Sequence, residues 1–323
     1  MRTVGIDLSI VVPCLNEEKL VPEFFSRAKA AADKVTDRWE IVMVDDGSTD
    51  STWDAIREHH RKNGRIKGLR LSKNHGHQTA LTAGLKASTG ARVLVIDSDL
   101  QDPPELVVEM NHLMTETGAD VVHAVRKTRE GETWFKLLTA AGFYWFLGFL
   151  SDLRIPKNSG DFKLISRRVV DVINRMPEGH RYLRGMIYSV GFRQVTLEYE
   201  RKPRAKGKSK FGLFRMVRFA LDGITSFSMK PLRLATLVGF ISGILGLFWA
   251  IWSVISSCFL GQPFSSISIF LPLFLFFSGL QLTVAGIMGE YVGRIFEQVK
   301  DRPLYIIDEQ VGVGLDATEV LDS

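Results

Sequence analysis

No charged side chain occurs between Arg233 and Glu290, and this gap constrains the fold more than any other feature of the 323-residue sequence. A helix needs roughly 20 apolar residues to cross a bilayer. Segments 234–260 and 267–289 both exceed that length, and the short turn 261–266 separates them. The sequence therefore predicts a transmembrane hairpin. Because a long polar region precedes it, we expect the chemistry to join a water-soluble reactant to a lipid-held one.

The region before the hairpin has the alternating strands and helices of a soluble domain. Short aliphatic or β-branched runs are followed by longer stretches with helical spacing, such as 17–35 and 104–117, and the runs lie at 8–13, 39–44, 66–71, 92–96 and 120–125. This alternation is typical of a buried, mostly parallel sheet covered by helices. The charged fraction of 24% is ordinary for a globular protein. We predict an α/β domain.

The flanking charges predict the orientation of the hairpin. Cations flank both spans, whereas the turn between them is uncharged; the flanking residues are Lys230, Arg233, Arg294, Lys300 and Arg302. Positive flanks stay on the cytoplasmic side, so we expect both termini and the soluble domain to be cytoplasmic. Only two cysteines occur, Cys14 and Cys258, which agrees with a reducing compartment. Nothing at the N-terminus resembles a signal peptide.

A run of cations without any acid precedes the hairpin and consists of Arg201, Lys202, Arg204, Lys206, Lys208, Lys210, Arg215 and Arg218. Such a run favours phosphate binding. A solvated face or an anchor to anionic lipid is the alternative, above all for Arg215 and Arg218. Segments 135–150 and 211–227 are rich in Phe and Leu, and we expect them to lie along the bilayer surface. For both, a helix of the soluble core is the alternative.

Polar clusters follow four of the predicted strands, at 13–18, 45–50, 72–77 and 97–102. Ligands of open α/β sheets bind beyond the carboxyl ends of the strands. Asp97, Asp99 and the amide of Gln101 are oxygen ligands suited to Mg²⁺ or Mn²⁺, with a diphosphate completing the shell. Taken alone, each acidic cluster has a structural alternative as a turn or helix cap. Their common position at the sheet edge, where carboxylates would repel without a cation, favours a functional site.

Five motifs in order resemble the family-2 glycosyltransferases that load polyprenyl phosphates: 11–18, 44–50, 74–80, 97–104 and 204–211. Dolichol-phosphate mannosyltransferase belongs to that group. Its members with a C-terminal membrane hairpin include the bacterial undecaprenyl-phosphate glucosyltransferases and the 4-deoxy-4-formamido-L-arabinose transferases. The resemblance runs from the first strand to about Asp308. Ser98 stands where the family usually has Ala, and His75 and His77 occupy variable positions, but neither departure removes a ligand atom.

The resemblance implies a GT-A fold, a Rossmann-like catalytic domain, and a set of site residues. It assigns the nucleotide sugar to Pro13, Asn16, Glu17, Asp45, Asp46 and Asp97. It assigns Mg²⁺ or Mn²⁺ to Asp97, Asp99 and Gln101. It places the lipid phosphate on Arg204, Lys206, Lys208, Ser209 and Lys210, and makes Asp99, Asp161, Arg204 and Lys210 the catalytic set. Asp161 is a candidate base or sugar-orienting carboxylate, with the cap of a helix over 165–175 as its alternative.

The chemistry agrees with this division of roles. The attacking group is a phosphate monoester with a second pKa near 6, so it is mostly ionised and needs no strong base. The resemblance implies inverting transfer, with UDP-glucose as the preferred donor and UDP-4-deoxy-4-formamido-L-arabinose or GDP-mannose as alternatives. A processive synthase would carry a Gln-x-x-Arg-Trp motif and more spans, and a non-catalytic scaffold would lack the acids. Transfer to a glycerolipid remains an open alternative.

These inferences divide the chain into four parts: a catalytic domain over 1–210, an interfacial helix over 211–232, the hairpin over 233–293 and a cytoplasmic tail over 294–323. The resemblance implies a location at the bacterial inner membrane. The expected partners are a nucleotide sugar, a polyprenyl phosphate and the bilayer, without nucleic acid. Small residues at four-residue spacing, Ala235, Gly239 and Gly243, let helices approach closely. They favour a homo-oligomer, for which a tetramer is one option, although membrane helices also tolerate glycine generally.

Overall fold

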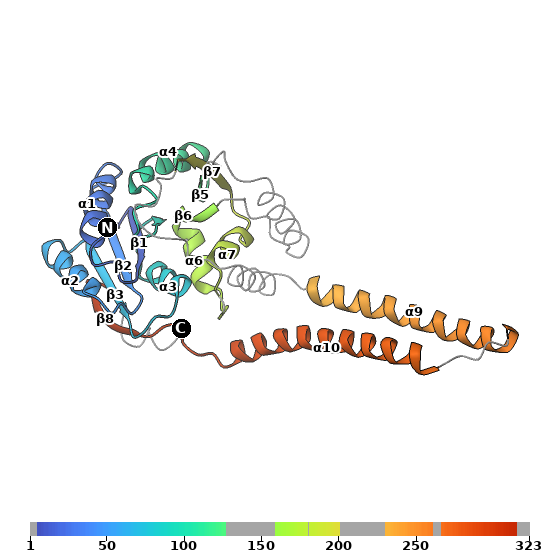
Figure 1. Cartoon of the computed structure of the whole chain (residues 1–323). Coiled ribbons are helices and arrows are strands. Elements are labelled where there is room, and N and C mark those ends of the chain that lie inside the picture. Colours follow the sequence, from blue (N-terminus) through green and yellow to red (C-terminus); the bar gives the residue numbers. More distant parts are fainter. Residues whose placement is uncertain (1–4, 127–158, 180, 201–229, 261–265, 315–323) are drawn as a thin grey trace. The chain divides into compact units, whose positions relative to one another are not determined.

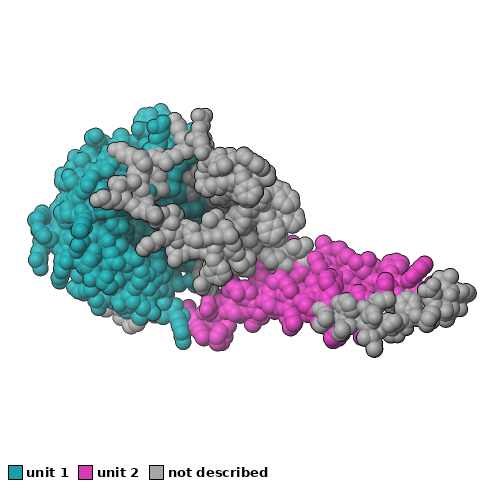
Figure 2. Space-filling model, viewed as in Figure 1, with its two compact units in different colours: residues 1–139, 153–211, 302–323 teal, residues 140–152, 212–301 magenta. Residues whose placement is uncertain are grey.

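The computed structural model describes residues 5–126, 159–179, 181–200, 230–260 and 266–314. The chain forms two compact units (Figure 2). The first comprises residues 1–139, 153–211 and 302–323, and the second comprises residues 140–152 and 212–301. The first unit carries the sheet and the second carries the two long helices.

The first unit is built on an eight-stranded mixed sheet. Its strands are β1 (Leu8–Cys14), β2 (Trp39–Asp45), β3 (Ile66–Leu71), β4 (Arg92–Val95), β5 (Val121–Arg126), β6 (Ser159–Ser166), β7 (Gln194–Tyr199) and β8 (Ile307–Val311). Their order is β7-β5-β6-β4-β1-β2-β3-β8. β1 pairs in parallel with β2 and β4, β2 with β3, and β5 with β7. β6 runs antiparallel to β4 and β5, and β8 runs antiparallel to β3.

Helices cover both faces of this sheet (Figure 1). They are α1 (Val21–Ala32), α2 (Thr52–Lys62), α3 (His77–Ala87), α4 (Val107–Thr117) after the 3₁₀ turn η1 (Pro104–Leu106), α6 (Arg167–Arg175) and α7 (Leu183–Ser189). Alternate strand residues such as Ile10 and Ile41 pack with Phe24 of α1 in one apolar core. On the other face, a Cβ at Gly84 of α3 would lie 2.4 Å from Val11 Cγ1. This glycine lets α3 lie directly against β1.

The predicted α/β domain with a mostly parallel sheet is confirmed, and the first five strands lie within a residue or so of their predicted bounds. Three strands, β6, β7 and β8, were not predicted. Residues 159–166 form a strand and α6 begins only at Arg167, so Asp161 is not a helix cap. The segment predicted as a tail contains β8, which pairs with β3. β8 was missed because its strand partner is far away in the sequence.

The second unit contains two long helices, α9 (Lys230–Leu260) and α10 (Ser266–Val299), which pack along each other. They lie where the two spans were predicted, and α10 continues ten residues beyond the predicted end at residue 289. Over the described parts of the chain, no helix is both long enough and apolar enough to cross a membrane. The transmembrane hairpin therefore stays a prediction. The predicted interfacial segments 135–150 and 211–227 lie outside the described residues.

Candidate active site

The polar ends of the strands meet at one edge of the sheet. β1 to β4 run parallel, so their carboxyl ends share that edge. β6 starts at the same edge because it is antiparallel to β4, with Lys163 opposite Val95. Two residues further along this register, Asp161 comes opposite Asp97. Ligands bind at this edge in open α/β sheets, which makes it the candidate active site.

Two carboxylates hold the turns after β2 and β3. Asp45 is fully buried, and its Oδ1 accepts the backbone N–H of Ser48 at 3.0 Å. Both carboxylate oxygens of Asp46 accept backbone N–H groups, from His75 at 2.7 Å and from Gly76 at 3.0 Å. Burial raises the pKa of both acids, and these hydrogen bonds oppose the rise. Asp46 thereby fixes the β3 turn against the β2 turn.

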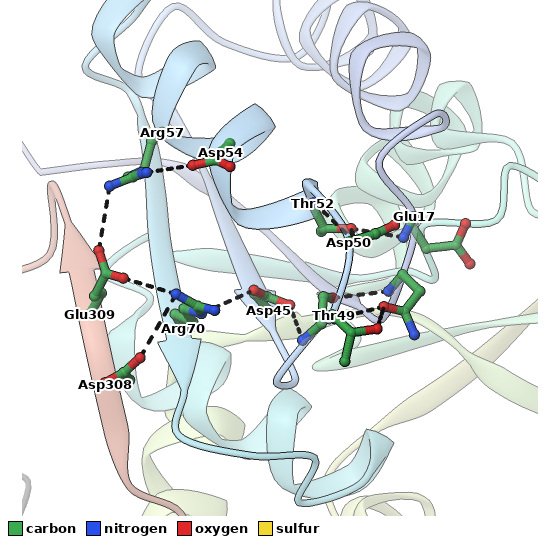
Figure 3. A network of polar contacts seen from close by, with 12 residues as sticks. Glu17, Asp45, Thr49, Asp50, Thr52, Asp54, Arg57, Arg70, Asp308 and Glu309 are labelled. Carbon is green, nitrogen blue, oxygen red and sulfur yellow. Dashed lines mark hydrogen bonds and ion pairs between the residues drawn. The ribbon is translucent and has the colours of Figure 1, made fainter.

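The turn after β1 is tied to the same region. Asn16 has a φ of 56°, in the left-handed region that Asn tolerates better than most residues. Its backbone N–H donates to Ser48 Oγ at 2.9 Å, and its Oδ1 accepts the N–H of Thr49 at 2.9 Å. The N–H of Glu17 donates to Thr52 Oγ1 at 2.9 Å. Figure 3 shows that the turns after β1 and β2 form one polar network.

The turn after β4 carries Asp97 and Asp99. Asp99 Oδ1 accepts the backbone N–H of Gln101 at 3.1 Å. Asp97 Oδ1 is buried, lies 3.4 Å from His77 Nε2 and has no hydrogen-bond partner within the described residues. Burial raises the pKa of Asp97 to about 6, His77 opposes the rise, and the carboxylates of Asp161 and Asp99 add to it. The negative charge of the carboxylates at this turn therefore exceeds the positive charge that His77 can provide.

This turn fits a divalent cation. Mg²⁺ and Mn²⁺ are bound in proteins by a few carboxylates together with substrate phosphates. Asp97 Oδ1 is a buried acceptor without a donor among the residues that the structure describes, and Asp99 follows two residues later. Elsewhere in the described ranges as well, no group of three or more His, Cys, Asp or Glu side chains could hold a metal by itself. A cation at Asp97 and Asp99 would therefore need the oxygens of a bound diphosphate.

Asp161 lies within a cluster of cationic and polar side chains from β6, α3 and α7. Its Oδ2 accepts a hydrogen bond from Gln78 Nε2 at 3.1 Å and lies 3.5 Å from His77 Nε2. Its Oδ1 lies 3.5 Å from Arg184 Nη2 and 3.8 Å from Lys163 Nζ. The Asp161 side chain is only 14% exposed. The cluster therefore compensates a carboxylate that is largely removed from water.

The cations around Asp161 keep it ionised. Burial opposes ionisation, but the hydrogen bond to His77 and the charges of Lys163 and Arg184 hold the pKa of Asp161 well below its usual range. Lys163 is 1% exposed, and burial lowers its pKa to about 8 while Asp161 acts in the opposite direction. A carboxylate with a lowered pKa is a weak base at neutral pH. The geometry favours an orienting role for Asp161 over that of a general base.

A second network holds the ends of β5 and β7. The Tyr199 hydroxyl donates to Asp102 Oδ1, and Arg126 Nη2 donates to Asp102 Oδ2 at 3.4 Å. Arg126 Nε donates to the Tyr199 hydroxyl oxygen at 3.3 Å. A Cβ at Gly160 would lie 3.3 Å from Arg126 Nη2, so the start of β6 passes close to this network. Asp102 thus links the turn after β4 to both strand ends.

The described part of the chain brings nine of the predicted site residues to this edge: Pro13, Asn16, Glu17, Asp45, Asp46, Asp97, Asp99, Gln101 and Asp161. Their individual roles stay predictions. The predicted lipid-phosphate residues Arg204, Lys206, Lys208, Ser209 and Lys210 lie outside the described residues.

Sequence reasoning missed four residues of the cluster around Asp161. His77 and Gln78 lie in the motif 74–80, but the motif alone gives them no role. Lys163 lies two residues after Asp161 on β6, a spacing that puts both side chains on one face of a strand, but no strand was predicted over 159–166. Arg184 has no local signal, because it reaches Asp161 only through the position of α7.

The mixed sheet, its two helical layers and the acidic turns at its carboxyl edge define a GT-A-like α/β protein. The chain belongs to glycosyl transferase family 2, because residues 9–173 match the model of that family. It is a glycosyltransferase. The family match begins at the second residue of β1, covers β2 to β6 and ends within α6.

Relatives extend the similarity over nearly the whole chain. The "uncharacterized glycosyltransferase YkcC" of Bacillus subtilis (strain 168) is 41% identical over 95% of both chains. The "SfII prophage-derived bactoprenol glucosyl transferase" of Shigella flexneri is 37% identical over 93% of this chain and 97% of its own. A solved structure, "Mannosyltransferase PcManGT from Pyrobaculum calidifontis in complex with GDP-Man and Mn2+", is 14% identical over 90% of this chain and 88% of its own, with a TM-score of 0.46. That score is too low to support an inference.

Proposed function

We propose that this glycosyltransferase moves glucose from UDP-glucose to the phosphate of undecaprenyl phosphate at the cytoplasmic face of a bacterial inner membrane. One observation carries the proposal: a relative named as a bactoprenol glucosyl transferase matches 93% of the chain at 37% identity. Bactoprenol is a bacterial polyprenol. The match extends over the first unit, which carries the candidate active site and is called the catalytic unit below, and over the apolar helices α9 and α10. It therefore includes the helices that would contact a lipid acceptor.

The site geometry supports a single displacement by the lipid phosphate. The phosphate monoester is mostly ionised at neutral pH because its second pKa is near 6. Asp161 is held ionised by Lys163 and Arg184, so it is suited to accept hydrogen bonds from hydroxyls of the sugar. When bound at Asp97 and Asp99, a divalent cation would neutralise the leaving nucleotide. Attack from the face opposite the leaving group inverts the anomeric centre.

The nucleotide would lie on the turns after β1 and β2. Asn16, Glu17, Asp45 and Asp46 gather there, and Asp45 Oδ2 is a buried acceptor that has no hydrogen-bond donor in the described part of the chain. Burying such an acceptor without a partner is costly. An N–H or O–H group of the nucleoside would provide the missing hydrogen bond to Asp45 Oδ2.

The proposal includes insertion of α9 and α10 into the bilayer. At about 1.5 Å per residue, a helix of 31 residues spans roughly 46 Å, longer than a hydrocarbon core of about 30 Å. Large apolar side chains on both helices are exposed in the isolated chain, among them Phe240, Phe248, Trp252, Phe270 and Leu282. Exposed apolar surface of this extent indicates contact with lipid or protein. The argument also rests on the uncharged sequence 234–289 as a whole, part of which lies outside the described residues.

A transfer assay with matched donors and acceptors tests this function. Purified full-length protein is incubated with Mg²⁺ or Mn²⁺, undecaprenyl phosphate and radiolabelled UDP-glucose, UDP-4-deoxy-4-formamido-L-arabinose or GDP-mannose. We expect label in the lipid fraction with UDP-glucose and none when EDTA is added. Diacylglycerol replaces undecaprenyl phosphate in a parallel reaction. Label on diacylglycerol alone, or with another donor alone, would contradict the proposal.

A further inference from the structure

The C-terminal strand β8 pairs with β3, whose other neighbour in the sheet is β2, the strand that ends at Asp45. Arg70 of β3 is opposite Glu309 of β8 in the register, and its Nη1 donates to Glu309 Oε1 at 2.9 Å. The same Nη1 lies 3.9 Å from Asp308 Oδ2. Figure 3 shows the Arg70 side chain between these two acids and Asp45. β8 therefore supplies the acids that set the position of the Arg70 side chain.

Arg70 in turn compensates the buried carboxylate of Asp45. Arg70 Nε lies 3.8 Å from Asp45 Oδ2, the oxygen that has no hydrogen-bond donor among the described residues. Asp45 is 0% exposed, whereas the Arg70 side chain is 33% exposed. A buried carboxylate requires a nearby cation, because water does not stabilise its charge. Arg70 could turn toward solvent if Glu309 and Asp308 did not hold it.

The connection from α10 to β8 is short and partly buried. α10 ends at Val299 and β8 begins at Ile307. Within this connection Tyr305 is 3% exposed, and the carbonyl oxygen of Ile306 accepts the N–H of Ser72 at 2.9 Å. Ser72 follows β3 directly. The segment after α10 is thus packed against the turn after β3, which Asp46 also holds.

We infer that β8 is part of the donor-binding machinery, and that Arg70 and Glu309 are positioning residues that hold Asp45 for the nucleoside. This inference rests on the proposed function, in which Asp45 contacts the nucleotide. The chain that leaves the catalytic unit for the long helices returns to it as β8. β8 thereby affects the affinity for the donor, although none of its residues contacts the reacting atoms.

Three variants of the full-length protein test the inference. Arg70→Gln removes the charge beside Asp45, and Glu309→Gln removes the acid that holds Arg70. Arg57→Gln is the matched control, because Arg57 of α2 pairs with Glu309 at 3.6 Å and with Asp54. UDP affinity is measured by calorimetry with Mg²⁺, and steady-state kinetics give kcat and separate KM values for UDP-glucose and undecaprenyl phosphate.

We expect Arg70→Gln to weaken UDP binding and raise the donor KM about three- to tenfold, because an intramolecular polar interaction of ordinary strength corresponds to that order of effect. Glu309→Gln changes both in the same direction by less. The acceptor KM and kcat stay near wild type in both variants. Arg70→Lys restores part of the UDP affinity. Arg57→Gln changes the UDP affinity by no more than the loss of an exposed ion pair would. If Arg70→Gln does not fold, the UDP affinity of Glu309→Gln tests the inference.

A UDP affinity of Arg70→Gln equal to that of Arg57→Gln would overturn the inference, as would a loss confined to kcat or to the acceptor KM. The outcome is separable from that of the proposed function. A wild-type protein that binds UDP but transfers no glucose to undecaprenyl phosphate contradicts the proposed function. In that case the UDP affinities of the Arg70 and Glu309 variants still test the role of β8. A wild-type protein that transfers glucose, with variants that bind UDP normally, contradicts the inference alone.

Discussion

At the scale of residues, the site separates carboxylates by the charge around them. Burial and the carboxylates of Asp161 and Asp99 raise the pKa of Asp97 to about 6, whereas His77, Lys163 and Arg184 hold the pKa of Asp161 well below its usual range. His77 Nε2 lies 3.4 Å from Asp97 and 3.5 Å from Asp161. The first arrangement favours a cation as partner, and the second provides a fixed anionic acceptor.

Asp99→Asn should abolish transfer and cation-dependent UDP binding while the fold is kept. The substitution removes the charge that a divalent ion needs and retains the shape of the side chain. Transfer is measured with Mg²⁺ and Mn²⁺, UDP binding by calorimetry, and folding by circular dichroism. Near-normal transfer with either ion would show that Asp99 is not a metal ligand.

Asp161→Asn should lower kcat by the same factor at every pH between about 6.5 and 7.5, below the pKa of about 8 of its neighbour Lys163. Because the folded pKa of Asp161 is below its ordinary value near 3.9, the carboxylate is ionised across this range and contributes equally throughout it. The loss of one charged hydrogen bond corresponds to about 1.5–3 kcal/mol, which is less than the loss in Asp99→Asn. The pH profile of kcat is the measurement. A general base would instead produce a limb that rises with pH in the wild type and disappears in the variant.

At the scale of elements, the turns after the parallel strands depend on backbone contacts that only small residues permit. Gly47 has a φ of +71°, and a Cβ there would lie 2.4 Å from the carbonyl carbon of Lys73. The turn after β2 therefore lies directly on the turn after β3. Asp46 adds two hydrogen bonds between the same turns.

Gly47→Ala should be destabilising and should weaken UDP binding. Gly118→Ala is the matched control, since Gly118 ends α4 with a φ of +63° and a Cβ added there would have nothing within 4 Å. In the control, alanine has to adopt a left-handed backbone conformation, which lowers the free energy of unfolding by about 1 kcal/mol. Gly47→Ala adds a clash with the backbone, which lowers it by about 1–3 kcal/mol more. Denaturant unfolding and UDP calorimetry measure both. Equal losses in the two variants would mean that the β2 and β3 turns move apart without cost.

The strands with buried aliphatic runs could be predicted from sequence, but β6, β7 and β8 were not. β1 to β4 are short, mostly aliphatic or β-branched runs that are followed by polar clusters, so their order of residues reveals both the strand and its functional end. β8 contains Asp308 and Glu309, and its contact with Arg70 spans 239 positions of sequence. No local pattern reports a pairing over that distance. The same limit applies to the site: Asp97 follows a visible strand, whereas Arg184 reaches Asp161 only in the folded chain.

At the scale of the whole molecule, the chain leaves the catalytic unit for two long helices and then returns to it. β7 precedes α9, and β8 follows α10 within the same sheet. The chain before α9 and the chain after α10 both contribute strands to the first unit, β7 before the helices and β8 after them. The positive flanks of the two helices predict that both ends of the hairpin are cytoplasmic.

Cysteine labelling tests that topology in a Cys258→Ser background. A cysteine at Gln262 should react with an impermeant thiol reagent from outside intact spheroplasts, whereas one at Ser323 should react only after permeabilisation. Labelling of both positions in permeabilised cells is the control for reactivity. Protection of position 262 together with labelling of position 323 in intact spheroplasts would reverse the orientation. Protection of both positions in intact spheroplasts would place the turn inside and exclude a spanning hairpin.

The central claim is that an ionised lipid phosphate displaces the nucleotide in one step. The most direct test is the structure of the product formed from UDP-glucose and undecaprenyl phosphate, determined by mass spectrometry and by NMR coupling constants at the anomeric centre. We predict a glucosyl phosphodiester of undecaprenol with a β linkage, because one displacement inverts the α linkage of the donor. An α-linked product, a sugar–protein adduct, or glucose released to water without a lipid product would contradict the account.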